Sequence, residues 1–248
     1  MVAGNQVEGG RDSILVSVAH GNRITGNRFT GLRFAVHYMY ANDNDVTDNV
    51  SIGNRVGYAL MYSREVRAWR NLSRDDEQHG LMLHTSYRSE VVENRIQRTR
   101  DQCAFVYTSA RNVVRGNRFE GCRIGVHYAG GAPDNVFTGN AFIDTENPVR
   151  FVGTTLYEWS QKGRGNYWSN HSAFDLNGDG IVDLSYRPYD VIDQIVWAHP
   201  LAKLLLSSPA VAVVRFVQRQ LPVLVPGGVI DSAPLMVPPP VPGPGTES

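Results

Sequence analysis

The chain has 248 residues, with 24 basic and 24 acidic side chains and therefore no net charge. Its length suits one elongated domain with a sizeable core, and the charge balance argues against nucleic acid or an anionic membrane surface as a general partner. No apolar run reaches the roughly 18 residues of a membrane span. Two cysteines are too few for a disulfide framework or a zinc site.

Asparagine recurs at a spacing of 22 or 23 residues, and residues 26–29 and 116–119 share the tetrapeptide Gly-Asn-Arg-Phe. The intervening segments alternate with a period of two and favour β-branched and aromatic residues. This pattern predicts an all-β solenoid, a right-handed parallel β-helix of about seven coils of 22–23 residues each. The repeated asparagines are expected to form a structural ladder at one corner: Asn5, Asn27, Asn49, Asn71, Asn94, Asn117 and Asn140.

Stacking the coils sorts the strand residues into inward and outward columns, because side chains alternate along a strand. His79 is then expected to be a satisfied core histidine and Cys103 a buried free thiol, since Cys122 belongs to a different wall of the next coil. Three mostly apolar columns are expected to face inward: Ile14, Val36, Tyr58, Leu81, Phe105, Val126 and Val149; Val16, Tyr38, Leu60, Leu83, Tyr107, Tyr128 and Phe151; and Phe34, Val56, His79, Cys103 and Ile124.

Two outward columns lie between them: Leu15, His37, Ala59, Met82, Val106 and His127; and Ser17, Met39, Met61, His84, Thr108 and Ala129. Met39, Met61 and His84 would stack on successive coils, with His37 and Met82 beside them. Thioether and imidazole ligands suit Cu(I), so the pattern predicts a transient copper site. The alternative is a sheet face that packs against another segment and uses methionine as filler.

Two acidic segments follow different patterns. The run from Asp75 to Glu77 could suggest a sugar-cleaving carboxylate pair, but it lies at a predicted turn and is better explained as solvated charge. Asp175, Asn177, Asp179 and Asp183 match the oxygen ligands at positions 1, 3, 5 and 9 of an EF-hand-like loop. Tyr186 stands where that loop needs a bidentate carboxylate, so the sequence predicts either a weak calcium site or a metal-free turn.

The repeat fades after residue 152, which divides the chain into coils (1–152), a cap (153–192), a helical partner-docking arm (193–236) and a Pro-rich disordered tail (237–248). Ser208-Pro209 is a typical helix start, and Pro222 is expected to end that helix. Exposed apolar faces predict partner docking, the alternative being that both helices fold back over the coils. The two faces comprise Ile195, Val196, Leu201, Leu204 and Leu205, and Ala210, Val213, Val214, Val217 and Leu221.

Several C-terminal motifs resemble the NosD family, the periplasmic maturation proteins of nitrous oxide reductase. They are Gly165-Asn166-Tyr167-Trp168-Ser169, the segment from Ala173 to Ile181, Tyr186-Arg187-Pro188 and the segment from Asp231 to Met236. The resemblance extends over nearly the whole chain, repeats included. It implies a non-enzymatic periplasmic β-helix that handles copper for the reductase. It also implies three further partners: the membrane subunit and ATPase of an ABC transporter, and a copper-donating lipoprotein.

The chain departs from this family at its N-terminus, where family members have a signal sequence and further coils. Here the first coil starts at Asn5, and the preceding residues lack the charged-then-apolar layout of a secretory signal. Two other functions remain open: a polysaccharide-binding or polysaccharide-cleaving β-helix, and a purely structural or adhesive one. The absence of acidic residues from the two outward columns argues against cleavage on that face.

Overall fold

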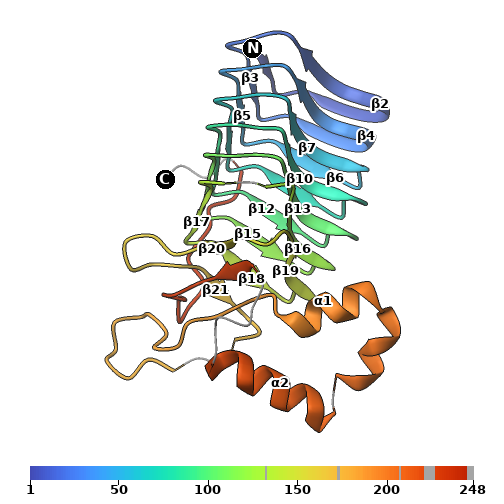
Figure 1. The fold of residues 1–248 in the computed structure, drawn as a ribbon. Helices are drawn as coiled ribbons and strands as arrows, with labels where there is room; N and C mark the ends of the chain where they lie inside the picture. The colour runs from blue at the N-terminus through green and yellow to red at the C-terminus, as the bar shows by residue number, and fades with distance from the viewer. Residues whose placement is uncertain (132, 172–173, 207, 221–226, 245–248) are drawn as a thin grey trace.

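A computed structural model describes residues 1–131, 133–171, 174–206, 208–220 and 227–244. The chain forms a right-handed parallel β-helix with helices at the end opposite the N-terminus, as the repeat predicts (Figure 1). Among these residues, no helix has both the length and the apolar character needed to cross a membrane.

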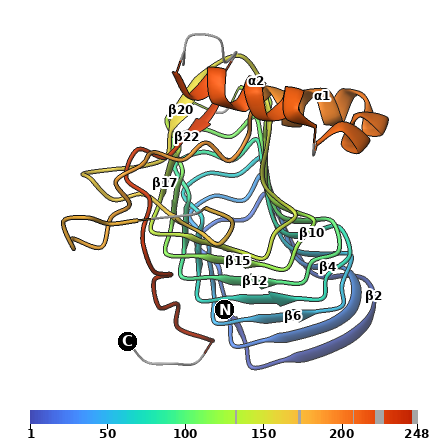
Figure 2. The ribbon, with the colours of Figure 1, turned by 90° about the horizontal axis from the view of Figure 1, so that it is seen from below.

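Each coil contributes strands to three walls, seen along the axis in Figure 2. The first wall is a seven-stranded parallel sheet of β1 (Val2–Ala3), β3 (Arg23–Thr25), β5 (Asp45–Thr47), β8 (Arg67–Trp69), β11 (Glu90–Val92), β14 (Val113–Arg115) and β17 (Val136–Thr138). The second wall contains β6 (Val50–Ile52), β9 (Leu72–Arg74), β12 (Arg95–Gln97), β15 (Arg118–Glu120), β18 (Ala141–Ile143) and β21 (Tyr167–Trp168). The third contains β7 (Val56–Met61), β10 (His79–His84), β13 (Gln102–Tyr107), β16 (Ile124–Ala129) and β19 (Asn147–Val152). In the first two coils, β2 (Gln6–Ser17) and β4 (Arg28–Met39) run through the second and third walls without interruption.

The first two predicted core columns are correct except on the fifth coil. Leu81 lies beside Ala104 and Leu83 beside Val106, and both partners are almost completely buried. Phe105 and Tyr107, predicted to face inward, instead lie in register with Met82 and His84. The true step between these coils is 23 residues, the spacing of Asn94 and Asn117, whereas the prediction placed Phe105 24 residues after Leu81.

The third predicted inward column is wrong for Phe34 and His79. Both rings lie on the outside, where Phe34 stacks on His37 with ring centroids 4.5 Å apart and His79 stacks on Phe105 at 5.3 Å. The strict alternation breaks because each coil turns two successive residues inward at a bend in the third wall. The first of the two is small on every coil from the second to the sixth: Ala35, Gly57, Gly80, Cys103 and Gly125. A Cβ at Gly80 would collide with the core side chain of Ile96.

This bend also corrects the prediction for the cysteines. Cys103 and Cys122 form a disulfide with Cα atoms 5.7 Å apart, and both are almost completely buried. The prediction of a free thiol is wrong because Cys103 enters the core next to the corner that carries Cys122. The 19-residue separation gives a stabilisation of roughly 3 kcal/mol by the loop-closure argument.

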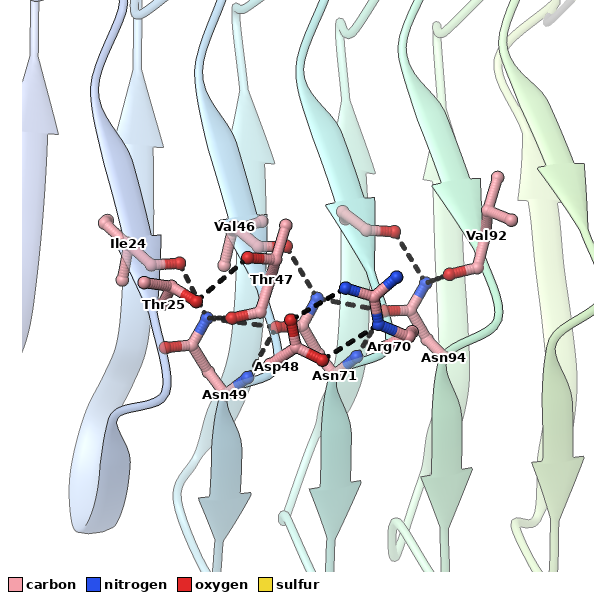
Figure 3. Close-up of polar contacts among 11 residues, drawn as sticks. Ile24, Thr25, Val46, Thr47, Asp48, Asn49, Arg70, Asn71, Val92 and Asn94 are labelled. Atoms are coloured by element: carbon pink, nitrogen blue, oxygen red, sulfur yellow. Dashed lines mark hydrogen bonds and ion pairs between the residues drawn. The ribbon is translucent and has the colours of Figure 1, made fainter. Parts of the chain in front are cut away.

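The predicted asparagine ladder is present, and it is buried from Asn27 to Asn140 (Figure 3). Asn49 Nδ2 donates to Asn71 Oδ1 (3.1 Å) and to the carbonyl oxygens of Ile24 and Thr47 (both 2.9 Å). Asn71 repeats the pattern by donating to Asn94 Oδ1 at 2.9 Å. Each amide thereby satisfies backbone groups that the turn would otherwise leave unpaired in the interior.

The ladder continues into the cap and ends at a carboxylate. Asn140 Nδ2 donates to Asn166 Oδ1 at 2.9 Å, and Asp231 Oδ2 accepts from Asn166 N (2.7 Å) and from Trp168 Nε1 (2.8 Å). Close by, β20 (Leu156–Glu158) pairs with β22 (Gly228–Ile230). Two of the motifs that carry the family resemblance therefore meet here and close the core. Residues 227–236 belong to this cap, whereas the sequence assigned them to the arm.

The arm consists of α1 (Val191–Ala198), a 3₁₀ helix (Pro200–Leu205) and α2 (Pro209–Gln220). A reciprocal capping box between Asp190 and Asp193 starts α1. Leu201 and Leu204 are each 82% exposed, so at these positions the arm does not fold back over the coils. Leu221 and Pro222, which were expected to complete the second helix, lie outside the described residues.

The segment after the cap differs from the predicted disordered tail. Val241 is buried, and its carbonyl oxygen accepts from Arg95 Nε at 2.9 Å. Proline leaves the carbonyls of this extended segment available, and the arginine of β12 supplies a donor for one of them. Residues 245–248 of the predicted tail lie outside the described part of the chain.

Candidate metal centre on the third wall

The outer face of the third wall brings together the methionines and one histidine of the predicted copper site. Met39 lies in register with Met61, and Met61 in register with His84, so the three occupy one column on successive coils. All three are half-buried. Figure 2 shows that the wall carrying β10, on which this column lies, is bent.

The neighbouring outward column contains His37, Ala59 and Met82. Met82 lies next to the column of Met39, Met61 and His84, and His37 lies farther from His84. His37 lies in register with Ala59, and Ala59 with Met82, so one coil separates His37 from Met82. Ala59 faces outward and yet is completely buried, so it lies beneath its larger neighbours. Met82 precedes His84 by two residues on β10, which puts both on the same face. Met61 is therefore flanked in its column by Met39 and His84, each one coil away, and Met82 lies on the same coil as His84.

The His84 ring is held by aromatic contacts and lacks a polar partner on one side. It stacks on Tyr107 with centroids 5.2 Å apart, and it meets Tyr62 edge-on at 5.0 Å. Its Nδ1 atom is buried and has no hydrogen-bond partner among the described residues. Burial lowers the pKa of His84 below its usual value of 6.5, which favours the neutral imidazole that metals bind.

His37 is held by a separate polar cluster. Its Nδ1 lies 3.4 Å from Asp12 Oδ2, and Asp12 forms two 2.9 Å hydrogen bonds with Arg33. Burial of the carboxyl group opposes ionisation, but hydrogen bonds from Arg33 and His37 lower the net pKa of Asp12. His37 Nε2 is buried without a partner in the described part of the chain. The predicted fifth ligand thus belongs to the same face but not to the central group.

Sequence reasoning missed the aromatic extension of this face. Phe105 stacks on His79 and also contacts the His127 ring at 5.2 Å, while Tyr107 covers His84. Burial, with the charge of Arg150 as a smaller contribution, lowers the pKa of His127 to about 4. A constant step of 23 residues across the fourth and fifth coils would have placed Phe105 and Tyr107 on this face from the sequence alone.

The available donors are soft and neutral. Within the described ranges, no three His, Cys, Asp or Glu side chains are arranged to hold a metal ion. Both cysteines are in the buried disulfide. The thioethers of Met39, Met61 and Met82 and the imidazole of His84 remain. These are ligands that fit Cu(I), and their partial exposure leaves the group open to exchange.

The predicted calcium loop is closed by its own hydrogen bonds. Asp175 Oδ1 accepts from Gly178 N at 2.7 Å and its Oδ2 from Gly180 N at 2.8 Å. The other three oxygen-bearing side chains, those of Asn177, Asp179 and Asp183, also accept backbone N–H bonds. The backbone hydrogen bonds to Asp175, the one from Gly180 first, lower the pKa of its carboxyl group. The loop therefore has the geometry of a turn that is complete without a metal.

The acidic run is not a uniformly solvated segment. Asp75 is exposed and bonds to Arg98, whereas Asp76 is completely buried and accepts from Asn54 N at 2.7 Å and Ser73 Oγ at 2.6 Å. Burial raises the pKa of Asp76 to about 6. The two carboxylates lie in different environments, one outside and one in the core, which does not suit a glycosidase pair.

The sequence matches a known protein family and two of its members. Residues 1–173 match the family model described as "Periplasmic copper-binding protein (NosD)". The chain is 37% identical over 193 residues to "Probable ABC transporter binding protein NosD" of Stutzerimonas stutzeri, covering 72% of this chain and 44% of that protein. It is 38% identical over 187 residues to the protein of the same name from Pseudomonas aeruginosa, covering 70% and 44%. The aligned region therefore spans less than half the length of these relatives. The match over most of its length shows that the chain belongs to the NosD family of periplasmic copper-binding proteins.

Proposed function

We propose that this chain is a non-enzymatic periplasmic accessory protein that binds Cu(I) transiently and passes it on during maturation of nitrous oxide reductase. It would act with the membrane subunit and ATPase of an ABC transporter and receive copper from a copper-donating lipoprotein. The family description and the relatives' names support copper binding and an association with an ABC transporter. The buried disulfide suits an oxidising compartment such as the periplasm.

The observation that carries this proposal is the column of Met39, Met61 and His84, with Met82 adjacent on β10. Three thioethers and one neutral imidazole prefer Cu(I) to Zn²⁺ because Cu(I) is the softer ion. In this proposal copper is the cargo, and these four side chains are its ligands, with His37 as a more distant group on the same face.

Weak retention is as important as binding for a protein that must release its metal. Metal-binding histidines usually donate their second ring nitrogen to a carboxylate or carbonyl, which strengthens the bond to the metal. His84 Nδ1 has no such partner within the described residues, and its ring is supported by Tyr107 and Tyr62 alone. We therefore expect the copper bond through His84 Nε2 to be weaker than in a permanent copper site.

The helical arm supplies the second half of the proposal. Leu201, Leu204, Val213 and Phe216 are each at least 60% exposed, on helices that lie in the sequence between the two segments that form the cap. Large exposed apolar patches usually mark interaction sites. We propose that this arm docks on the membrane subunit of the transporter.

The test is a metal-selectivity measurement on the purified chain. Under anaerobic conditions, the protein is dialysed against Cu(I) in one chamber and Zn²⁺ in another, and bound metal is quantified. We expect substantial Cu(I) retention and little Zn²⁺. Comparable retention of both metals, or of neither, would contradict a soft Met/His site.

A further inference from the structure

The third wall carries two histidine–methionine pairs on its outer face, in opposite order along the chain. His37 and Met39 lie two residues apart on β4, and Met82 and His84 lie two residues apart on β10. Residues two apart on a strand point to the same side, so each pair presents an imidazole and a thioether together. Since β7 lies between β4 and β10, the pairs are two strand spacings apart, roughly 10 Å. Strand side chains stand roughly perpendicular to the sheet, so the two histidines are not placed to hold a single ion.

The coil between the pairs supplies one soft ligand. In one outward column the residue between the pairs is Ala59, whose short side chain is completely buried. In the other column it is Met61, which is half-buried. The thioether of Met61 therefore lies one coil from either pair and can bond to an ion at either one.

His37 differs from His84 because a carboxylate supports its ring. The His37 side chain is 7% exposed, and Asp12 Oδ2 lies 3.4 Å from its Nδ1 atom. Asp12 is itself held by two hydrogen bonds from Arg33. With the Nδ1 proton donated to this carboxylate, the lone pair is on Nε2, which is buried and has no hydrogen-bond partner in the described part of the chain. Histidines that bind metals usually have such a partner, because it fixes the tautomer and the orientation of the ring.

We propose that His37 and Met39 form a second Cu(I) site, separate from the site at Met82 and His84, and that Asp12 is the positioning residue for His37. The proposal rests on the proposed function, because it assigns a second binding position to the same cargo. Imidazole and thioether ligands together suit Cu(I). An ion at the His37 site must displace the side chains that cover Nε2, so this site fills after the more exposed site at His84.

The two sites give the ion a path along the wall. Cu(I) bonded to Met61 and His84 reaches the second site when its bond to His84 breaks and a bond to His37 Nε2 forms, while Met61 stays bound. The ion remains Cu(I) throughout. The metal thereby moves from an open position to a covered one.

The test counts bound ions and follows the methionine methyl groups by NMR, since Cu(I) is diamagnetic. The full chain, labelled with ¹³C-methyl methionine, is titrated anaerobically with Cu(I) against a competing chelator at pH 7. Single leucine substitutions assign the signals of Met39, Met61 and Met82. We expect wild type to bind two equivalents, the second of which shifts the Met39 signal. His37→Ala and Met39→Leu should each bind one equivalent.

The role of Asp12 is tested by Asp12→Asn, which removes the charge and keeps the size of the side chain. We expect affinity for the second equivalent to fall about tenfold or more, with the first equivalent unchanged. The matched control is Asp45→Asn on the first wall, where the Asp45 carboxylate pairs with Arg67 at 2.7 Å. This variant should bind both equivalents like wild type.

Saturation of wild type at one equivalent, or uptake of two equivalents by His37→Ala, would overturn the second site. Wild-type affinity for the second equivalent in Asp12→Asn would overturn the role of Asp12. Failure of the proposed function gives a different result, in which wild type retains no Cu(I). Uptake of a single equivalent that shifts Met61 and Met82 would leave the proposed function intact and remove the second site alone.

Discussion

His84 differs from an ordinary surface histidine because stacked rings cover it and one ring nitrogen has no polar partner in the described structure. Its neighbours Met61 and Met82 have no protonation equilibrium in the physiological range. Any pH dependence of copper affinity in this group should therefore come from His84. At the scale of single residues, the pH dependence of copper affinity therefore distinguishes the role of His84 from that of the methionines.

We predict that Cu(I) affinity weakens as pH falls through the lowered pKa of His84, below the ordinary 6.5. Protons compete with the metal only when the pH approaches that pKa. His84→Ala should bind more weakly at pH 7 and lose this pH dependence, whereas Met61→Leu should bind more weakly and keep it. Chelator competition between pH 5 and 8 measures both, and an unchanged pH profile in His84→Ala would exclude His84 as a ligand.

Asp76 makes a second prediction at this scale. Its folded-state pKa of about 6 lies above the ordinary 3.8, so the folded protein binds the proton more tightly than the unfolded chain does. Stability should therefore fall as pH rises from about 4 to 6, by roughly 3 kcal/mol at about 1.4 kcal/mol per pKa unit. Asp76→Asn should abolish this dependence in urea unfolding.

The matched control is Asp75→Asn on the exposed neighbour. The hydrogen bond from Arg98 lowers the pKa of Asp75, so its contribution has the opposite sign, present above pH 3.8 and lost as pH falls. If Asp76→Asn retains the wild-type pH profile, the buried carboxylate is not its source.

At the scale of elements, the loop containing Asp175 and Asp179 is held by its own hydrogen bonds and also carries oxygen atoms that can bind a metal ion. We propose that it stabilises the cap without metal and binds calcium weakly, because no carboxylate occupies the twelfth position. Asp175→Ala should lower Tm in calcium-free buffer, since the backbone N–H groups of Gly178 and Gly180 lose their acceptor. If calcium raises the Tm of wild type and Asp179→Ala equally, the loop is not where calcium binds.

The arm makes a prediction of its own. Replacing both Leu201 and Leu204 with serine removes exposed apolar surface that contributes little to the described core. Tm should therefore stay within about 2 °C of wild type, as expected for substitutions at exposed positions. Co-purification with the transporter's membrane subunit should be lost. Lys203→Ser, on the same 3₁₀ helix, is the control and should co-purify normally. Retention of the membrane subunit by the leucine variant would contradict docking through this face.

At the scale of the whole molecule, the repeat was predictable because every coil requires the same backbone bonds. The ladder asparagines occupy one structural position, so their spacing reports the coil length directly. The outward placement of Met39, Met61 and His84 followed from the same period. The bend at Gly57 and Gly80 was not predictable by alternation, because two successive residues turn inward there.

That single irregularity explains the errors at Phe34, His79 and Cys103. It moved Phe34 and His79 to the outer face and brought Cys103 against Cys122. The hydrogen bond by which Asp231 ends the ladder was also not predictable from the sequence, because Asn166 and Asp231 lie 65 residues apart and share no repeat. Long-range pairs of this kind are set by the packing of the cap and leave no periodic signal in the sequence.

The central claim is that the Met/His column binds Cu(I), and a competition titration against a Cu(I) chelator at pH 7 tests it most directly. Wild type, Met61→Leu and His84→Ala are compared with Met236→Leu, which changes a methionine in the cap. We predict that Met61→Leu and His84→Ala stay folded and bind Cu(I) at least about tenfold more weakly, and that Met236→Leu binds like wild type. If both column variants remain folded and hold copper as tightly as wild type, the column on the third wall is not the copper site.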